Sequence, residues 1–141
     1  MKKWFRPLLL FFIVICLSHN LVYAQEMPPQ EVVQKQLEFY NKRDITGFMS
    51  VIDPNIVFYD FSTGQKTMEG AKACRAFYRA LFDASPTLHS KILTRTVFGN
   101  RVIDHEAISG RNGSDQILEL VLIFEVKGEK IIKITVIKKE M

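Results

Sequence analysis

The chain has 141 residues, 48% hydrophobic and 24% charged, and a formal net charge of +4 at pH 7. This length predicts one domain with one core, and excludes a chain of several domains. The sequence has no Cys/His cluster with zinc spacing, no phosphate-binding glycine loop and no internal repeat, so we predict no metal and no nucleotide or other cofactor.

The first 24 residues have the pattern of an export signal. A basic start precedes an apolar run over residues 8–17, which is shorter than the ~20 helical residues that span a bilayer. Val22 and Ala24 provide the small side chains of a cleavage site, so the mature chain is predicted to begin at Gln25. We therefore expect a periplasmic or secreted protein that does not contact the membrane after cleavage, with a retained membrane anchor as the alternative.

Cleavage would also change the charge of the protein. Residues 1–24 hold three of the 19 basic residues and none of the 15 acidic ones, so the net charge would fall from +4 to +1. The basicity belongs mostly to the signal, and we predict no nucleic-acid partner. Cys74 would be the single remaining cysteine, which excludes an internal disulfide and favours a small core or near-surface residue over a nucleophile.

The mature chain begins with two predicted helices. After a polar linker at residues 25–30, the domain is predicted over 31–141, and its first helix carries an apolar stripe that includes Tyr40. Asp44 is the expected N-cap of a short second helix, which the Asp53-Pro54 pair ends.

A first strand and a third helix follow. Residues 55–61 read "NIVFYDF" and predict a strand in which Asp60 is the only acid. A loop with room for a short strand leads to a helix over residues 71–84, whose inner face is predicted to carry Ala73, Phe77, Ala80 and Leu81.

From His89 onward the pattern changes to strands joined by tight turns. The expected strands are residues 91–98, 101–109, 116–126 and 131–139, with Gly99-Asn100, "RNGS" and "KGEK" as turns. Helices followed by an antiparallel meander predict an α+β domain: a cone-shaped, curved antiparallel sheet with three helices from the N-terminal half on its concave side.

The hairpin at Gly99-Asn100 predicts a strand register. A two-residue loop places Thr94 opposite His105, Arg95 opposite Asp104 and Leu93 opposite Glu106. We interpret the Arg95–Asp104 pair as belonging to a solvent-exposed face. His105 is then predicted to point to the other, mostly apolar side, which would line a pocket, although a slip of one residue would reverse this assignment.

The last hairpin predicts one uniformly apolar face, which should pack against the helices or a dimer partner. Glu125 is expected opposite Lys133 on the other face. The apolar set comprises Leu122, Phe124, Val126, Ile132, Ile134 and Val136.

The order of elements, the stretch "VVQKQLEFYNKRDITGFMSVIDPNIVFYDF" and the later "GNRVIDHEAISGR" resemble the nuclear transport factor 2-like superfamily. Within it the chain is most similar to SnoaL-like and ketosteroid-isomerase-like proteins, over residues 30–138. The resemblance implies a conical scaffold that hosts isomerases, cyclases, hydrolases, dehydratases and non-catalytic binders. It also implies a homodimer, since this fold commonly pairs through its exposed sheet face.

The resemblance implies candidate catalytic residues. Asp60 falls where ketosteroid isomerases carry the aspartate that moves the proton. Their two oxyanion donors would fall at Gln36 and at about Leu122, where neither donor is kept, although Tyr40 lies one turn from Gln36 and could replace the phenol. His105 is our own inferred partner for Asp60. The alternatives are that Asp60 caps a turn amide and that His105 is a half-buried histidine held by Thr94 or a backbone carbonyl.

Three functions remain open from the sequence. The first is an exported domain that binds a small hydrophobic molecule in a conical pocket, without turnover. The second is a cofactor-free isomerase, cyclase or dehydratase with Asp60 as base and His105 or Tyr40 as partner. The third is a dimeric protein-interaction module. The expected pocket lining is Gln36, Phe58, Thr94, Thr96, Ile103 and Leu122.

Overall fold

The computed structural model describes residues 26–139, so the predicted export signal and its cleavage site lie outside the described residues. No helix within this range is long and apolar enough to cross a bilayer. The elements in chain order are α1 (Pro29–Lys42), α2 (Ile45–Ser50), β1 (Ile52–Asp60), β2 (Lys66–Glu69), α3 (Ala71–Asp83), β3 (His89–Phe98), β4 (Arg101–Ser109), the 3-10 helix η1 (Arg111–Gly113), β5 (Leu118–Lys127) and β6 (Lys130–Lys138).

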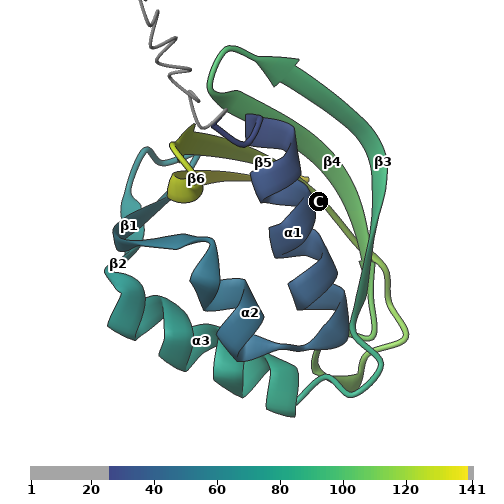
Figure 1. Ribbon diagram of the computed structural model, residues 1–141. Coiled ribbons are helices and arrows are strands. Elements are labelled where there is room, and N and C mark those ends of the chain that lie inside the picture. Colours follow the sequence, from purple (N-terminus) through teal and green to yellow (C-terminus); the bar gives the residue numbers. More distant parts are fainter. Residues whose placement is uncertain (1–25, 140–141) are drawn as a thin grey trace, which may run out of the picture.

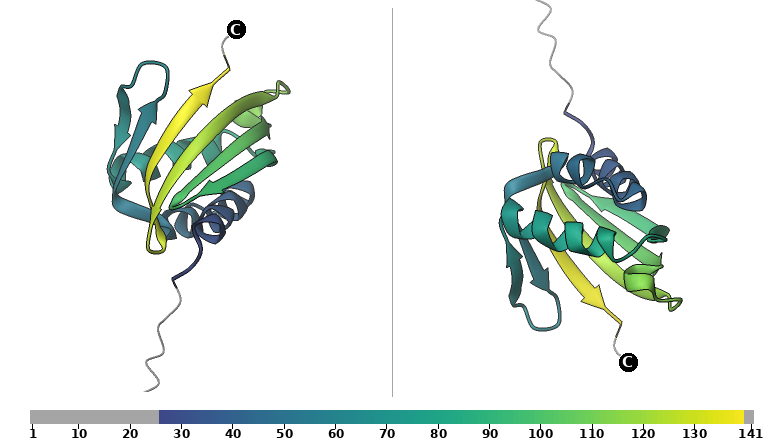
Figure 2. Two further views of the ribbon diagram at one scale, coloured as in Figure 1. Left: turned by 90° about the horizontal axis from the view of Figure 1, so that it is seen from above. Right: turned by 90° about the horizontal axis from the view of Figure 1, so that it is seen from below.

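The strands form one curved sheet in the order β2-β1-β6-β5-β4-β3, and the three α-helices lie on its concave side (Figures 1 and 2). The predicted α+β class and the position of the helices are confirmed. The sheet is mixed rather than wholly antiparallel, because β1 runs parallel to β6 while the other neighbours are antiparallel. β2, α3 and the strands β3 to β5 lie between β1 and β6 in the chain, so the connection is long enough for the parallel pairing.

The first two helices begin as their sequences predict, but α2 ends at Ser50, so Asp53 and Pro54 lie in β1 and do not end the helix. Pro29 occupies the first turn of α1, where its missing N–H is not needed. The Asp44 side chain caps α2 by accepting a hydrogen bond of 2.9 Å from the Gly47 N–H. The buried face of α1 carries Val32, Val33, Gln36, Leu37 and Tyr40.

The predicted inner face of α3 is wrong except at Leu81. Ala73 and Ala80 are exposed and Phe77 is 44% exposed, whereas Cys74 is fully buried. The side of α3 that faces the core is the one that carries two other aromatic residues. Tyr78 and Phe82 pack with Tyr40 and Phe48 at ring-centroid distances of 4.3–6.3 Å.

The register of β3 and β4 is confirmed, but the assignment of their faces is wrong. Thr94 pairs with His105 and Arg95 with Asp104 as predicted, while a bulge at Leu93 places Ile92 opposite Glu106. Asp104 is fully buried and Glu106 is 5% exposed, so both lie on the concave side together with Val102 and Ile108. The Arg95–Asp104 pair and Glu106 therefore point to the core, and His105 points to the convex, solvent-facing side.

The last hairpin follows its prediction apart from one residue. Leu122 pairs with Val136 and Phe124 with Ile134 on the concave side, facing the helices. On the convex side Lys133 lies 3.2 Å from Glu125, as expected. A register shift between Glu125 and Val126 brings Ile131, rather than Ile132, into the core.

Candidate functional site

A cluster of polar side chains lies between α1 and the concave face of β3 and β4. Alternation along β4 turns Asp104 and Glu106 inward, and β3 contributes Ser90 opposite Ile108. Tyr40 projects from the last turn of α1 toward this region. Asn41 fixes the end of the helix to β3, since its amide donates to the Ser90 carbonyl at 3.0 Å and its oxygen accepts from the Ser90 N–H at 2.7 Å.

One part of the cluster is a largely buried ion pair between Arg95 and Asp104. Arg95 donates two parallel hydrogen bonds of 2.7 Å to the Asp104 carboxylate, whose side chain is 1% exposed. A third guanidinium nitrogen donates to the Gln34 side-chain oxygen at 2.9 Å. Because every oxygen of Asp104 is engaged by a bidentate partner, this pair satisfies itself and ties α1 to the sheet.

Glu106 is the titratable group of the cluster. Its carboxyl oxygen Oε2 accepts a hydrogen bond of 2.7 Å from the Ser90 hydroxyl. Burial raises the pKa of Glu106 to about 7; the Ser90 hydrogen bond lowers it and the Asp104 charge raises it. A carboxyl group with this pKa exchanges its proton near neutral pH, which is the property that general acid–base chemistry requires.

The Tyr40 hydroxyl is buried and has no hydrogen-bond partner among the described residues. Burial raises the pKa of Tyr40 to about 12, the nearby Arg111 guanidinium lowers it without reaching the geometry of a hydrogen bond to the hydroxyl, and the Glu106 charge raises it. The phenol is therefore neutral and able to donate. Since buried polar groups are nearly always paired, an unpaired hydroxyl beside Glu106 is the most unusual polar feature of the concave side.

Apolar side chains surround these polar groups. Phe58 packs 6.3 Å from the Tyr78 ring, and Phe48 and Phe82 complete the aromatic cluster around Tyr40. Several other apolar residues contact this core but keep part of their surface accessible: Met68, Leu120, Leu122 and Val136. Gln36 is 6% exposed on the same face of α1, one turn before Tyr40.

Asp60 caps a backbone amide of the following turn, which was the alternative to a catalytic role. Its Oδ1 accepts hydrogen bonds from the Thr63 N–H at 3.1 Å and the Thr63 hydroxyl at 3.2 Å, and Lys138 Nζ lies 3.3 Å from Oδ2. The Thr63 N–H, and then Lys138, hold the pKa of Asp60 below its usual range. The carboxylate caps the turn after β1 and is a weaker base than Glu106.

His105 does not share a pocket with Asp60. It lies on the convex side, with Nε2 3.5 Å from the Glu119 carboxylate, beside a shallow hollow of about 300 Å³. Three of the predicted lining residues, Thr94, Thr96 and Ile103, alternate to this side as well. Of the predicted set, the structure places Tyr40, Gln36, Phe58 and Leu122 on the concave side, and Asp60 lies on the same side at the accessible end of β1.

Glu106 was not predicted as a site residue from the sequence. The available signal was the buried pattern of β4, in which Val102 and Ile108 share a face with the two acids. On the opposite face, Ile103 and Ala107 flank His105 and outweighed that signal. Within residues 26–139, no group of three or more His, Cys, Asp or Glu side chains is arranged to hold a metal ion.

Comparison with protein families places this geometry in a known group. The SnoaL-like domain family matches residues 33–134. The chain belongs to this family. A search of curated proteins found no match.

Solved structures share the fold of this SnoaL-like protein. A nuclear transport factor 2-like protein of unknown function from Cytophaga hutchinsonii superposes with a TM-score of 0.67 at 12% identity, covering 82% of this chain and 94% of the other. A protein from Kribbella flavida, provisionally named a ketosteroid isomerase, gives 0.70 at 13% identity over 82% and 81%. One from Sinorhizobium meliloti, provisionally named a polyketide cyclase, gives 0.63 at 20% identity over 75% and 93%. These identities establish the common fold alone.

Proposed function

We propose that this SnoaL-like protein binds a small, mainly apolar molecule on the concave side of its sheet, with a ligand oxygen accepting a hydrogen bond from Tyr40. The observation that carries the proposal is the buried Tyr40 hydroxyl without a partner. A buried donor left unpaired costs about 1–3 kcal/mol, which a ligand carbonyl or ether oxygen would recover. Glu106 provides a second polar contact, because its carboxyl group is protonated below about pH 7 and can then donate.

The apolar body of the ligand would lie against the side chains that contact the core yet remain partly accessible. Leu120, Leu122 and Val136 come from neighbouring strands, and Met68 comes from β2 across the sheet. Small-molecule sites typically combine such a mainly apolar lining with a few fixed polar groups. This arrangement supports hydrophobic carbonyl compounds as the ligand class.

A thermal-shift screen tests binding. We would compare steroids and aromatic polyketides with hydrocarbons of matched shape that lack the oxygen. A ligand at ~100 times its dissociation constant should add about 2.7 kcal/mol to the free energy of unfolding. The Tyr40→Phe variant should lose about tenfold in affinity for the oxygen-bearing compounds and keep its affinity for the hydrocarbons.

Tyr59→Phe is the matched control, because Tyr59 lies on the convex side, 5.2 Å from Lys133 Nζ. It should leave every affinity unchanged. Equal affinities of Tyr40→Phe and the unaltered protein for all compounds would contradict the proposed contact.

A second candidate function is proton transfer next to a carbonyl group, and the raised pKa of Glu106 favours it. The Glu106 carboxylate would remove a proton from the carbon next to the carbonyl, leaving the electron pair on the enolate oxygen. Tyr40 would donate a hydrogen bond to that oxygen, and Glu106 would return the proton to the product. A positioned base of this kind contributes ~10²–10⁴ in rate.

Deuterium uptake into a bound hydrophobic ketone, followed by NMR in heavy water, tests this chemistry. The rate should fall as the pH drops below about 7, because Glu106 becomes protonated, and Glu106→Gln should abolish it. Asp60 as the base stays an alternative prediction: if Asp60→Asn abolishes exchange and Glu106→Gln does not, the assignment to Glu106 is wrong.

Export and homodimer formation are further parts of the proposal. Export predicts a mature chain that begins at Gln25, which mass spectrometry of the secreted or periplasmic protein would detect. For the dimer we propose pairing of the convex sheet faces, where Ile103, Val121, Ile123 and Ile137 are half-buried in the single chain. Light scattering after size exclusion should give twice the chain mass, and a monomer at high concentration would exclude the dimer.

A further inference from the structure

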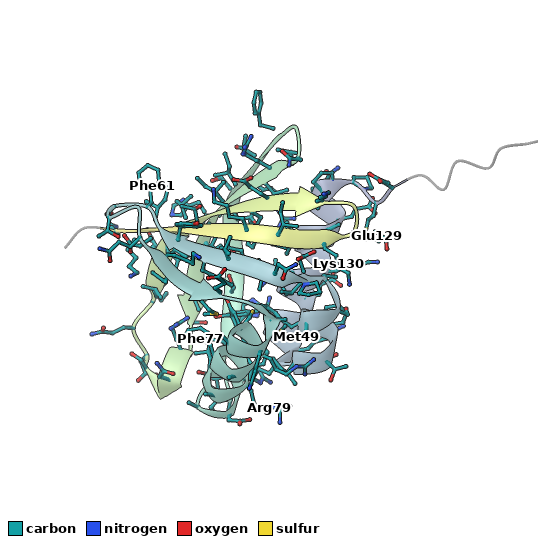
Figure 3. The ribbon with its side chains drawn as sticks, turned by 90° about the vertical axis from the view of Figure 1, so that its left-hand side faces the viewer. Met49, Phe61, Phe77, Arg79, Glu129 and Lys130 are labelled. Carbon is teal, nitrogen blue, oxygen red and sulfur yellow. The ribbon has the colours of Figure 1, made fainter. Side chains whose placement is uncertain are left out.

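A second hollow lies outside the concave site, where the end of α2, the start of β1, the first turns of α3 and the β5–β6 hairpin meet. Its volume is about 500 Å³, within the ~300–1,000 Å³ of small-molecule sites. Figure 3 shows Met49 and Lys130 on the same side of the molecule, away from Phe61. The lining residues are Met49, Ile52, Pro54, Ala71, Lys72, Arg75 and Lys130.

All the charged side chains that line this hollow are basic. Lys72, Arg75 and Lys130 line it, and no acidic residue does. Lys72 and Arg75 form no ion pair with another described residue. Three acids lie outside the lining: Asp53 accepts from the Asn55 N–H at 2.8 Å, the Glu69 carboxylate lies 2.6 Å from Lys66, and Glu129 is exposed next to Lys130 in the hairpin. The lining itself is therefore positively charged.

Two of the three cations project from one helix and the third is fixed by the backbone. Lys72 and Arg75 stand three positions apart on α3, so they share one face of the helix. Lys130 donates a hydrogen bond to the Ser50 carbonyl at the C-terminal end of α2. The same hairpin is anchored by a 2.8 Å hydrogen bond from the Ile131 N–H to the Val51 carbonyl. The three cations thus lie around a common volume.

The floor of the hollow is apolar. Ile52 is 3% exposed and Met49 is 9% exposed, and Pro54 and Ala71 complete the surface between the charges. An inorganic anion would pair with the cations but leave the apolar floor exposed to solvent. A neutral apolar molecule would cover the floor but leave the cations without a counter-charge. Only a molecule that carries both a negative charge and an apolar body uses the whole lining.

We propose that this hollow binds an amphiphilic organic anion, with its carboxylate facing Lys72, Arg75 and Lys130 and its short apolar body on Met49 and Ile52. The site is separate from the one beside Tyr40, and it does not depend on the function proposed above.

NMR titration of the protein tests this with three probes: octanoate, octanol and inorganic phosphate. Octanoate should shift the Met49 methyl and Ile52 amide signals saturably. Octanol and phosphate should each bind at least about tenfold more weakly, because each offers half of the required chemistry. Equal binding of octanoate and octanol, or saturation by phosphate alone, would overturn the proposal.

Paired variants locate the site. Lys72→Gln with Arg75→Gln should weaken octanoate about tenfold, and both changes are on exposed positions of α3. Arg79→Gln is the matched control, since Arg79 is exposed one turn further along α3 and does not line the hollow (Figure 3). It should leave octanoate affinity unchanged.

The titration also separates this site from the concave one. Unchanged affinity in the double variant, or shifts at Tyr40 and Leu122 in place of Met49 and Ile52, would overturn the proposal. Shifts at Tyr40 and Leu122 would at the same time support the function proposed for the concave side.

Discussion

Each face of the sheet carries an ion pair, but the two pairs differ in how far they are exposed to solvent. On the concave side the Arg95–Asp104 pair has side-chain exposures of 20% and 1%; on the convex side the Lys133–Glu125 pair has exposures of 36% and 20%. When an ion pair is removed from water, each charge is stabilised mainly by its partner. The charges of an accessible pair are also stabilised by solvent. The consequence of losing one partner should therefore differ several-fold between the faces.

Two acids of the concave side extend the comparison. Burial raises the pKa of Glu106, while the Thr63 N–H and Lys138 lower that of Asp60 at the accessible end of β1. The difference comes from solvent and hydrogen-bond donors, since both groups are ordinary carboxyls. Position along the concave surface, rather than residue type, determines which acid can exchange a proton near neutral pH.

The largest expected effect compares neighbouring residues of β5. Phe124 is fully buried on the concave side, so Phe124→Ala should lower the free energy of unfolding by about 3–5 kcal/mol. Ile123 is half-buried on the convex side, and Ile123→Ala should cost about 1 kcal/mol. Urea unfolding measures both values. Equal costs would mean that the convex face is covered as completely as the concave one.

The next effect compares the two ion pairs. Asp104→Ala leaves the Arg95 guanidinium without its bidentate partner and should cost about 3 kcal/mol or more. Glu125→Ala on the convex side should cost at most about 1 kcal/mol. The same unfolding measurements apply, and a cost below about 1 kcal/mol for Asp104→Ala would show that the concave pair is solvated like the convex one.

A third effect concerns Glu106 and pH. Its pKa in the folded protein, about 7, lies above the ordinary value of 4.5 that the unfolded chain would have. The folded state therefore binds more protons between these values, and stability attributable to Glu106 falls as pH rises through that window. The loss is complete above about pH 7 and amounts to ~3 kcal/mol.

Glu106→Gln keeps a partner for the Ser90 hydroxyl but cannot ionise. Between pH 4 and pH 8 the unaltered protein should lose ~3 kcal/mol of unfolding free energy that the variant keeps. The variant should therefore gain that amount of stability relative to the unaltered protein over this range. Glu125→Gln serves as the control and should change that difference by less than about 1 kcal/mol. A constant difference for Glu106→Gln would exclude a raised pKa in the folded state.

Local chemistry was enough to predict the elements and much of the strand pairing. The Asp44 cap, the stripe that ends at Tyr40 and the turn at Gly99-Asn100 each depend on residues close in sequence. The parallel pairing of β1 with β6 and the bulge at Leu93 depend on distant segments, and no local pattern specifies them. The orientation of α3 was missed for a similar reason, because Tyr78 turns inward to meet rings from α1 and α2.

The candidate site was only partly predictable. Tyr40 and Leu122 were assigned to the concave side through helical spacing and an unbroken apolar face. Glu106 and His105 were exchanged between faces because β4 alternates polar residues on both sides, and because the two hydrogen bonds of a bidentate ion pair offset part of its desolvation cost and allow its burial. Register is set by turn length, but which face becomes the interior is set by the packing of the helices.

The smallest expected effect is on the convex side. His105 is half-exposed and its ion-pair partner, Glu119, also lies 3.6 Å from Lys139 Nζ. Because Glu119 keeps a cation when the imidazole is removed, His105→Ala should change the free energy of unfolding by less than about 0.5 kcal/mol. The same variant should leave ligand affinity and deuterium exchange unchanged, since His105 points away from Tyr40 and Glu106. Loss of either property in His105→Ala would return the functional site to the convex side and overturn the assignment of the concave cluster.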